Sequence, residues 1–183
     1  MIINKAIKNL FRAQGFSLVE MLIYVGVLSV IFLVVVNTSL SFSSSYRVLS
    51  ALRSADHAGI DALEPMTRAI RAAGSVVDAQ SVLGNNPGSL TLYSAQGGNS
   101  TTTQFYLQNG TVEMTVTVNN SQDAELSGPL TASDANITSL VFNELSTSTA
   151  SAVKIDMTVV GQSGAVTETK NFHSTIVLRG SNS

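Results

Sequence analysis

A run of 21 residues near the N-terminus, residues 16–36 (FSLVEMLIYVGVLSVIFLVVV), constrains this chain more than any other feature. Seventeen of its side chains are apolar, and after Glu20 no charged residue occurs until Arg47. As an α-helix the run is about 31 Å long, which matches the hydrocarbon core of a bilayer. The pattern therefore predicts a transmembrane helix over residues 16–36.

The charges on either side of this run predict its orientation. Residues 1–15 contain three basic residues and no acidic residue, whereas the chain from Phe16 onward has a formal charge of −5. Basic flanks stay in the cytoplasm, so we expect residues 1–15 inside and the C-terminal portion outside. The apolar run is longer than that of a secretory signal peptide, and it continues into a Ser-rich polar sequence without an A-x-A cleavage pattern.

Glu20 is the one charged residue within the apolar run. On insertion scales an ionised carboxylate costs about 2.5–3.5 kcal/mol at the centre of a bilayer, and less near its interface. Two interpretations remain open from the residues alone. Glu20 is either an acid tolerated close to the interface or an acid that finds a positively charged partner in the membrane.

The residues around Glu20 form a recognisable motif. The sequence Gly15-Phe16-Ser17-Leu18-Val19-Glu20 follows a short basic leader and precedes about 20 apolar residues. It resembles the class III signal of type IV prepilins and secretion pseudopilins. The resemblance implies that prepilin peptidase cuts after Gly15 and that the new amine of Phe16 is N-methylated. It also implies that Glu20 pairs with the N-terminal ammonium of a neighbouring subunit during assembly.

The same resemblance implies a function and a set of partners. The mature chain is expected to be a non-catalytic structural subunit, a minor pilin or pseudopilin of a type IV pilus or type II secretion filament. Its partners would be prepilin peptidase, other pilin or pseudopilin subunits and the inner-membrane assembly platform. Residues 47–74 and 172–180 are similar to minor pilins and the J-type minor pseudopilin. An alternative is a surface adhesin or DNA-uptake pilin that acts as a binding module.

Residues 37–74 are predicted to continue the helix as an amphipathic half. Apolar residues recur at spacings of three or four, which predicts a buried stripe made of Leu49, Leu52, Ile60, Leu63, Met66, Ile70 and Ala73. Pro65 lies inside this pattern and is expected to kink or restart the helix. Gly74 is expected to end it.

Residues 75–183 are predicted to form an antiparallel β head domain, because the apolar period changes to two. The predicted strands are 103–108, 111–118, 137–143, 153–160 and 170–178, with a weaker one at 89–94. Asn109-Gly110 indicates a type I′ turn and the Gly161–Gly164 segment another turn, with loops at 84–88, 95–102 and 119–136. The predicted fold class is therefore α+β and pilin-like, with a long N-terminal helix packed on an antiparallel β-sheet.

Composition limits the chemistry that the chain can perform. It has no cysteine and two histidines, His57 and His173, both expected on exposed surfaces. No nucleophile motif or phosphate-binding loop is evident, so we expect neither an enzyme nor a cofactor. Asp123, Glu125 and Asp134 could supply oxygen ligands for calcium, but their spacing matches no calcium loop, and no metal site is predicted. The acidic balance also argues against nucleic-acid binding.

Overall fold

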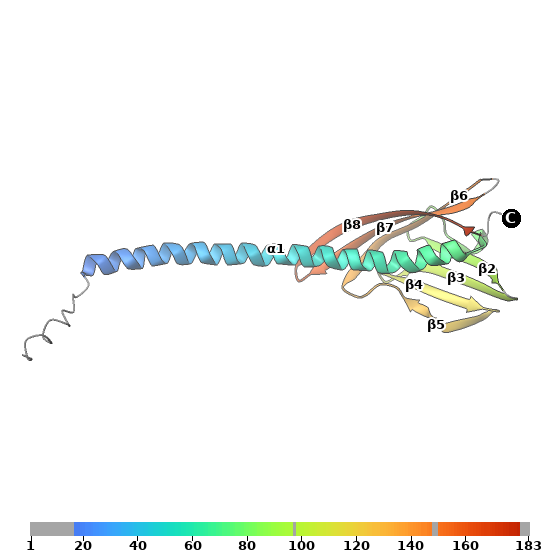
Figure 1. Ribbon diagram of the computed structural model, residues 1–183, viewed down its shortest axis with the longest axis horizontal. Helices are drawn as coiled ribbons and strands as arrows, with labels where there is room; N and C mark the ends of the chain where they lie inside the picture. Colours follow the sequence, from blue (N-terminus) through green and yellow to red (C-terminus); the bar gives the residue numbers. More distant parts are fainter. Residues whose placement is uncertain (1–16, 97, 148–149, 180–183) are drawn as a thin grey trace, which may run out of the picture. The chain divides into compact units, whose positions relative to one another are not determined.

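The computed structural model describes residues 17–96, 98–147 and 150–179. Within them the chain forms one long helix, a 3-10 turn and eight strands, and it divides into two compact units between Ser44 and Ser45. The elements are α1 (Leu18–Ala72), β1 (Ser75–Val76), η1 (Asp78–Gln80), β2 (Ser89–Gln96), β3 (Asn99–Gln108), β4 (Thr111–Val118), β5 (Ser121–Pro129), β6 (Ala135–Ser146), β7 (Ser151–Ser163) and β8 (Val166–Val177). Figure 1 shows their order along the chain.

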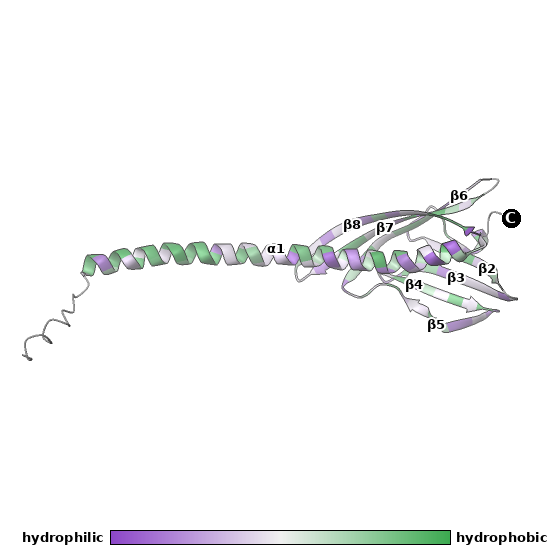
Figure 2. Cartoon of the chain, viewed as in Figure 1, coloured by the Kyte–Doolittle hydropathy of each residue, from purple (hydrophilic) through white to green (hydrophobic). Residues whose placement is uncertain are grey.

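The first unit consists of the apolar part of α1 and the polar residues that follow it. Every side chain from Leu18 to Ser44 is exposed, and the change from apolar to polar residues is visible along the helix in Figure 2. The polar stretch remains helical, and hydroxyls within it are satisfied by carbonyls of the same helix. Thr38 Oγ1 donates to the carbonyl of Val34 at 2.8 Å. One helix therefore covers both predicted helical segments.

In the second unit the second half of the predicted stripe, which contains Met66, Ile70 and Ala73, is buried, but α1 buries a different set of residues in the first half. The buried positions are Ala51, Ala55, Ala58, Gly59, Ala62, Met66 and Ile70. Leu49 and Ile60 belong to the predicted stripe, yet they are 46% and 56% exposed. The prediction of the stripe was therefore wrong for its first half. The cause is the close approach of the sheet, which leaves room for only small side chains along the first turns of the contact.

The helix ends close to Gly74, as predicted, but the restart predicted as one outcome at Pro65 does not occur. α1 does not restart at Pro65 but continues to Ala72, although Pro65 has no N–H for the carbonyl of Asp61. Gly74 does not cap the helix in a left-handed conformation, since its φ lies outside that region. Instead its N–H donates to the carbonyl of Tyr93 at 2.9 Å, so a sheet hydrogen bond ends the helix.

The strands form two antiparallel sheets rather than the single sheet that was predicted. One has the order β1-β2-β3-β4-β5, and the other has the order β6-β7-β8. All six predicted strands are present, and most are longer than expected. The predicted loops at 95–102 and 119–136 were wrong, because β2 and β3 extend into the first and β5 occupies much of the second. The polar sequence of β5 hid it, since an edge strand with both faces exposed needs no apolar alternation.

Asparagine residues form the turns of the two hairpins that extend from β3 to β5. Asn109 and Gly110 have φ values of 52° and 79°, which confirms the predicted type I′ turn. Asn119 and Asn120 have φ values of 49° and 65° and connect β4 to β5 in the same way. Asparagine tolerates this left-handed region better than most other side chains do. The Asn119-Asn120 pair was therefore the sequence feature that could have predicted a turn after β4 and a further strand, β5.

Gly161 was predicted to lie in a turn, but it lies in β7, against α1. The turn lies at Gly164, where φ is 62°. A Cβ atom on Gly161 would lie 1.9 Å from the carbonyl oxygen of Ala51 and 2.7 Å from the nitrogen of Ala55. Gly59 plays the corresponding role on the helix, because a Cβ there would lie 2.3 Å from the ring of Phe172 in β8. Two glycines therefore allow the helix backbone and the sheet to meet.

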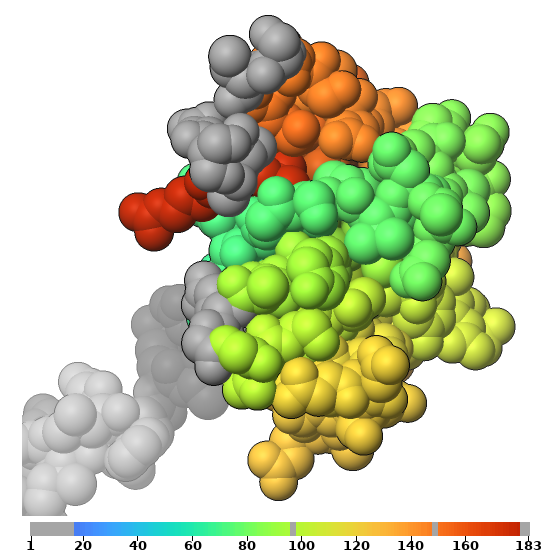
Figure 3. Space-filling view, turned by 90° about the vertical axis from the view of Figure 1, so that its right-hand side faces the viewer, coloured from blue at the N-terminus to red at the C-terminus, as the bar shows by residue number. Residues whose placement is uncertain are grey.

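A single core joins α1 to both sheets. Its largest buried side chains include Met66 and Ile70 from the helix, Phe105 from β3 and Phe142 from β6. The loop at 84–88, confirmed as a loop, hydrogen-bonds to β6 through Gly84 and Gly88, which donate to the carbonyls of Phe142 and Leu140. In Figure 3 the green part of the chain, which includes the end of α1, lies between the orange part, from the β6-β7-β8 sheet, and the yellow part, from the other sheet.

Gly161→Ala should destabilise the second unit by about 2 kcal/mol, because the added methyl group overpacks the contact with the backbone of Ala51. Chemical unfolding of the full chain in detergent, followed by circular dichroism, measures the change. Gly74→Ala is the matched control. A Cβ at Gly74 meets its nearest atom at 3.7 Å, an ordinary contact, so it should cost less than about 0.5 kcal/mol. Equal stability of the two variants would contradict this account of the helix–sheet contact.

Candidate functional site

The candidate functional site is the exposed apolar segment of α1 from Leu18 to Val36. The exposed fractions of its large apolar side chains range from 38% for Val36 to 81% for Leu18. The segment is long and apolar enough to cross a membrane, and no residue of its most apolar window is buried within the chain. A contiguous apolar surface of this length needs lipid or other protein surfaces around it. Its chemistry is therefore that of insertion and helix association.

Glu20 lies in the first turn of α1, at the start of this segment. A carboxylate at a helix N-terminus interacts favourably with the helix dipole, which helps to explain an acid at this position. Tyr24 lies one turn further along and donates its hydroxyl to Glu20 Oε1 at 3.4 Å, a long hydrogen bond. The side chain of Glu20 is exposed. Its carboxylate can therefore accept a further donor from outside the chain.

Small residues interrupt the apolar surface without adding unsatisfied polar groups. Ser29 Oγ donates to the carbonyl of Val25 at 2.7 Å, so its hydroxyl is already paired within the helix. Gly26 has no atom within 4 Å of the position that a Cβ would take. Such residues allow helix backbones to approach one another closely in a membrane. They are candidates for a helix–helix contact surface.

The other predicted site residues, Gly15 and Phe16, lie outside the described residues. The description begins at Ser17, whose carbonyl accepts the N–H of Met21 at 3.1 Å. The predicted cleavage junction and the predicted site of N-methylation therefore stay predictions.

Two of the three calcium candidates, Asp123 and Asp134, accept hydrogen bonds in separate places. Asp123 Oδ1 accepts the backbone N–H groups of Glu125 and Leu126 at 3.0 and 3.2 Å, which fixes a local turn in β5. Asp134 Oδ2 accepts the hydroxyl of Ser54 at 2.9 Å and so links the loop before β6 to α1. In the part of the chain that the structure describes, no group of three or more His, Asp or Glu side chains is arranged to hold a metal ion.

The two histidines occupy exposed positions, as predicted, and one of them belongs to a charged cluster. His57 is exposed on α1. His173 Nδ1 lies 2.6 Å from Asp156 Oδ1, and Lys154 Nζ lies 2.9 Å from Asp156 Oδ2. The hydrogen bonds from Lys154 and His173 hold the pKa of Asp156 below its usual value. Sequence reasoning missed this cluster because it depends on the β7–β8 register, which places Asp156 opposite His173.

Glu144 shows the opposite electrostatic effect. Burial raises the pKa of its carboxyl, and the nearby Asp78 carboxyl raises it further. Asp78 belongs to η1, between β1 and β2, so the sequence did not indicate that it lies close to Glu144 in β6. A carboxyl group whose pKa is raised in the folded state stabilises the fold at low pH. This contribution to stability is lost as the pH rises through the folded pKa.

No family profile matches this chain, and no curated protein or solved structure proves similar to it. Function is therefore inferred from the chain's own residues and geometry.

Asp156→Asn should remove a pH-dependent part of the stability. Because the pKa of Asp156 is lowered in the folded state, its contribution is present at neutral pH and is lost as the pH falls through that lowered value. The cluster is partly exposed, so we expect a loss of at most about 1 kcal/mol at pH 7. Unfolding measured between pH 7 and pH 2 should show the two proteins converging in acid. A difference that grows in acid would refute the assignment.

Proposed function

We propose that this chain is a non-catalytic structural subunit, a minor pilin or pseudopilin, of a type IV pilus or type II secretion-like filament. The observation that carries the proposal is the wholly exposed apolar half of α1, with Glu20 at its start. The second half of the same helix is fixed in the core of a folded β unit. Such a helix suits a subunit that is held first by lipid and later by neighbouring subunits.

Before assembly, residues 16–36 cross the inner membrane once, with the basic leader in the cytoplasm and the C-terminal unit outside. On assembly the helix exchanges contacts with lipid for contacts with the same segment of other subunits. The apolar side chains need no rearrangement for this exchange, since both environments are apolar. Close helix packing then depends on dispersion and on small residues such as Gly26 and Ser29.

Glu20 selects the position of the incoming subunit in this proposal. A carboxylate within an apolar helix bundle is costly unless it is paired and hydrogen-bonded. Cleavage after Gly15 creates an amine on Phe16 that supplies the opposite charge, and methylation leaves that charge in place. The pair therefore favours the register in which Glu20 of one subunit meets Phe16 of the next. The partners are prepilin peptidase, other pilin or pseudopilin subunits and the inner-membrane assembly platform.

The mature chain should begin at Phe16 and carry a methyl group on its N-terminal nitrogen. Intact-mass and peptide mass spectrometry of protein recovered from cells that contain prepilin peptidase measures both features. Gly15→Leu should block the cut, because a bulky residue at the scissile bond hinders entry into a tight site, whereas Gly15 has no side chain. A mature chain that starts at any other residue would refute the assignment.

Glu20→Ala should leave cleavage intact and reduce incorporation into filaments by about tenfold or more, since the partner amine loses its counter-charge in an apolar environment. The measurement is the ratio of the chain in sheared filaments to the chain in membranes, by immunoblot. Asp61→Ala is a suitable control, because it removes an exposed acid from the same helix outside the apolar segment. Normal incorporation of Glu20→Ala would exclude the pairing role.

A further inference from the structure

The edges of the two sheets differ in how they are protected from pairing with another strand. β1 is only two residues long. β5 is irregular, with a shift in register against β4, and Asp123 accepts two of its backbone N–H groups. The outer edge of β6 is covered by the loop at 84–88, which hydrogen-bonds to the carbonyls of Leu140 and Phe142. Such features are the usual protection of edge strands.

β8 has none of these features. It is 12 residues long and pairs with β7 from Val166 to Val177 without a shift in register. Among the described residues no other strand or loop hydrogen-bonds to its outer edge. Its exposed side chains include three threonines and a valine, residues that suit strand pairing: they are Thr167, Thr169, Lys170, Asn171, His173, Thr175 and Val177, of which Lys170 is ion-paired with Asp56 of α1. The strand therefore presents a long, regular and open edge.

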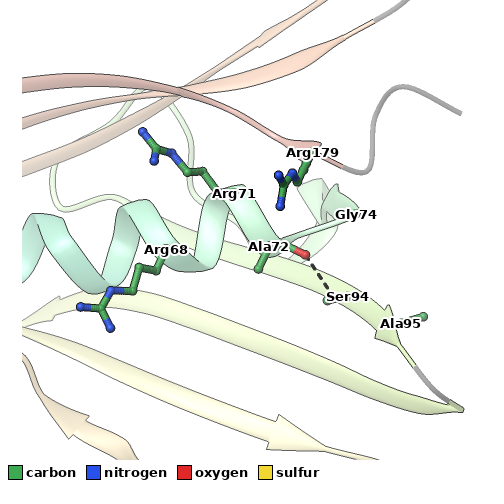
Figure 4. Close-up of a pocket in the computed structure, with 7 residues that line it drawn as sticks. All are labelled: Arg68, Arg71, Ala72, Gly74, Ser94, Ala95 and Arg179. Carbon is green, nitrogen blue, oxygen red and sulfur yellow. Dashed lines mark hydrogen bonds between the residues drawn. The ribbon is translucent and has the colours of Figure 1, made fainter.

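A groove follows the last part of this edge. Its volume is about 570 Å³, and it is lined by the five consecutive residues from Thr175 to Arg179 and by Arg71 of α1. Thr175, Ile176 and Val177 belong to β8 and point to alternate faces, so a groove that contacts all three lies along the backbone edge. Leu178 and Arg179 follow the strand and extend the groove. A second pocket of about 540 Å³ is lined by Arg71 and Arg179 and also by Arg68, and it continues past the end of the helix to Ser94 (Figure 4).

Two arginines give this groove a positive charge. Arg68 is ion-paired with Glu64, and in Figure 4 it extends away from Arg71 and Arg179, which lie on the other side of the helix end. Within residues 17–96, 98–147 and 150–179, neither Arg71 nor Arg179 forms an ion pair with an acidic residue. Both are exposed. Arginine binds carboxylates through a rigid set of donors, so these two groups match an acidic ligand.

We propose that the outer edge of β8 binds an extended acidic segment of another polypeptide. The segment adds to the three-stranded sheet as a further strand, through backbone hydrogen bonds, and its carboxylates contact Arg71 and Arg179. The open edge supplies affinity for any extended chain, and the arginines select an acidic one. This inference concerns the C-terminal unit and does not depend on the proposed filament function.

Three fluorescent peptides test the inference against the full chain in detergent. The first has alternating Thr and Val in the middle and two Glu at each end. The second carries Lys in place of Glu, and the third is the acidic peptide with a methyl group on every backbone nitrogen of its middle segment, so that neither of its edges can donate to a strand. By fluorescence anisotropy the acidic peptide should bind at least about tenfold more tightly than either of the others, because they lack the charge or the donors.

Variants of the chain locate the binding site. The double variant Arg71→Ala/Arg179→Ala should reduce the preference for the acidic peptide by about tenfold, whereas Arg47→Ala/Arg53→Ala, which removes two exposed arginines away from the groove, should retain it. Failure of the acidic peptide to bind at about 1 mM, or equal binding of the acidic and basic peptides, would overturn the proposal. Equal binding of the methylated peptide would overturn the strand geometry. These peptide comparisons use the unaltered chain and so do not depend on the folding of a variant.

Discussion

The contact of α1 with β7 and β8 is the interaction on which the rest of the C-terminal unit depends. The helix supplies a buried row of alanines, and Gly161 and Gly59 remove the side chains that would hold the backbones apart. Dispersion attraction between atoms falls steeply with distance. Small side chains let the helix and the sheet approach closely, and so they strengthen this contact. Beyond Ala62 larger residues such as Met66 enter the core shared by both sheets.

The apolar half of α1 has the opposite character to its second half. There the side chains are large, none is buried within the chain, and the hydroxyls of Ser29 and Thr38 are satisfied by the helix itself. A helix without unpaired polar groups is one of the few structures that a lipid environment accepts. The same element therefore meets two different environments, and the change occurs in the polar stretch at 37–45.

The sequence was most informative where a single local rule decides the structure. The apolar run over 16–36 and the type I′ turn at Asn109-Gly110 could be predicted because composition and backbone conformation alone determine them. The face of α1 could not, because the search for large apolar residues overlooks alanines that are buried by a close neighbour. Gly161 was misread for the same reason, since a glycine that admits a helix and a glycine that forms a turn look alike in sequence.

Longer-range features were beyond sequence reasoning. The division into two sheets depends on the hydrogen bonds of Gly84 and Gly88 to β6, across more than 50 residues of chain. The cluster at Asp156 and the groove beside Arg71 and Arg179 both require the register of β8. Of the predicted site residues, Glu20 is the one that the structure describes, and its assembly role, which rests on its sequence motif, stays a prediction.

The contact between Ala51 and Gly161 also sets an order in time. The two residues are about 110 positions apart, and β7 and β8 are the last strands of the chain. A ribosome makes the alanine face long before it makes the strands that cover it. The nascent C-terminal unit therefore keeps this face and its partner strands apart until β7 and β8 have been synthesised. Folding of the core is thus a late event relative to the synthesis of α1, and the apolar segment is complete well before the unit behind it becomes compact.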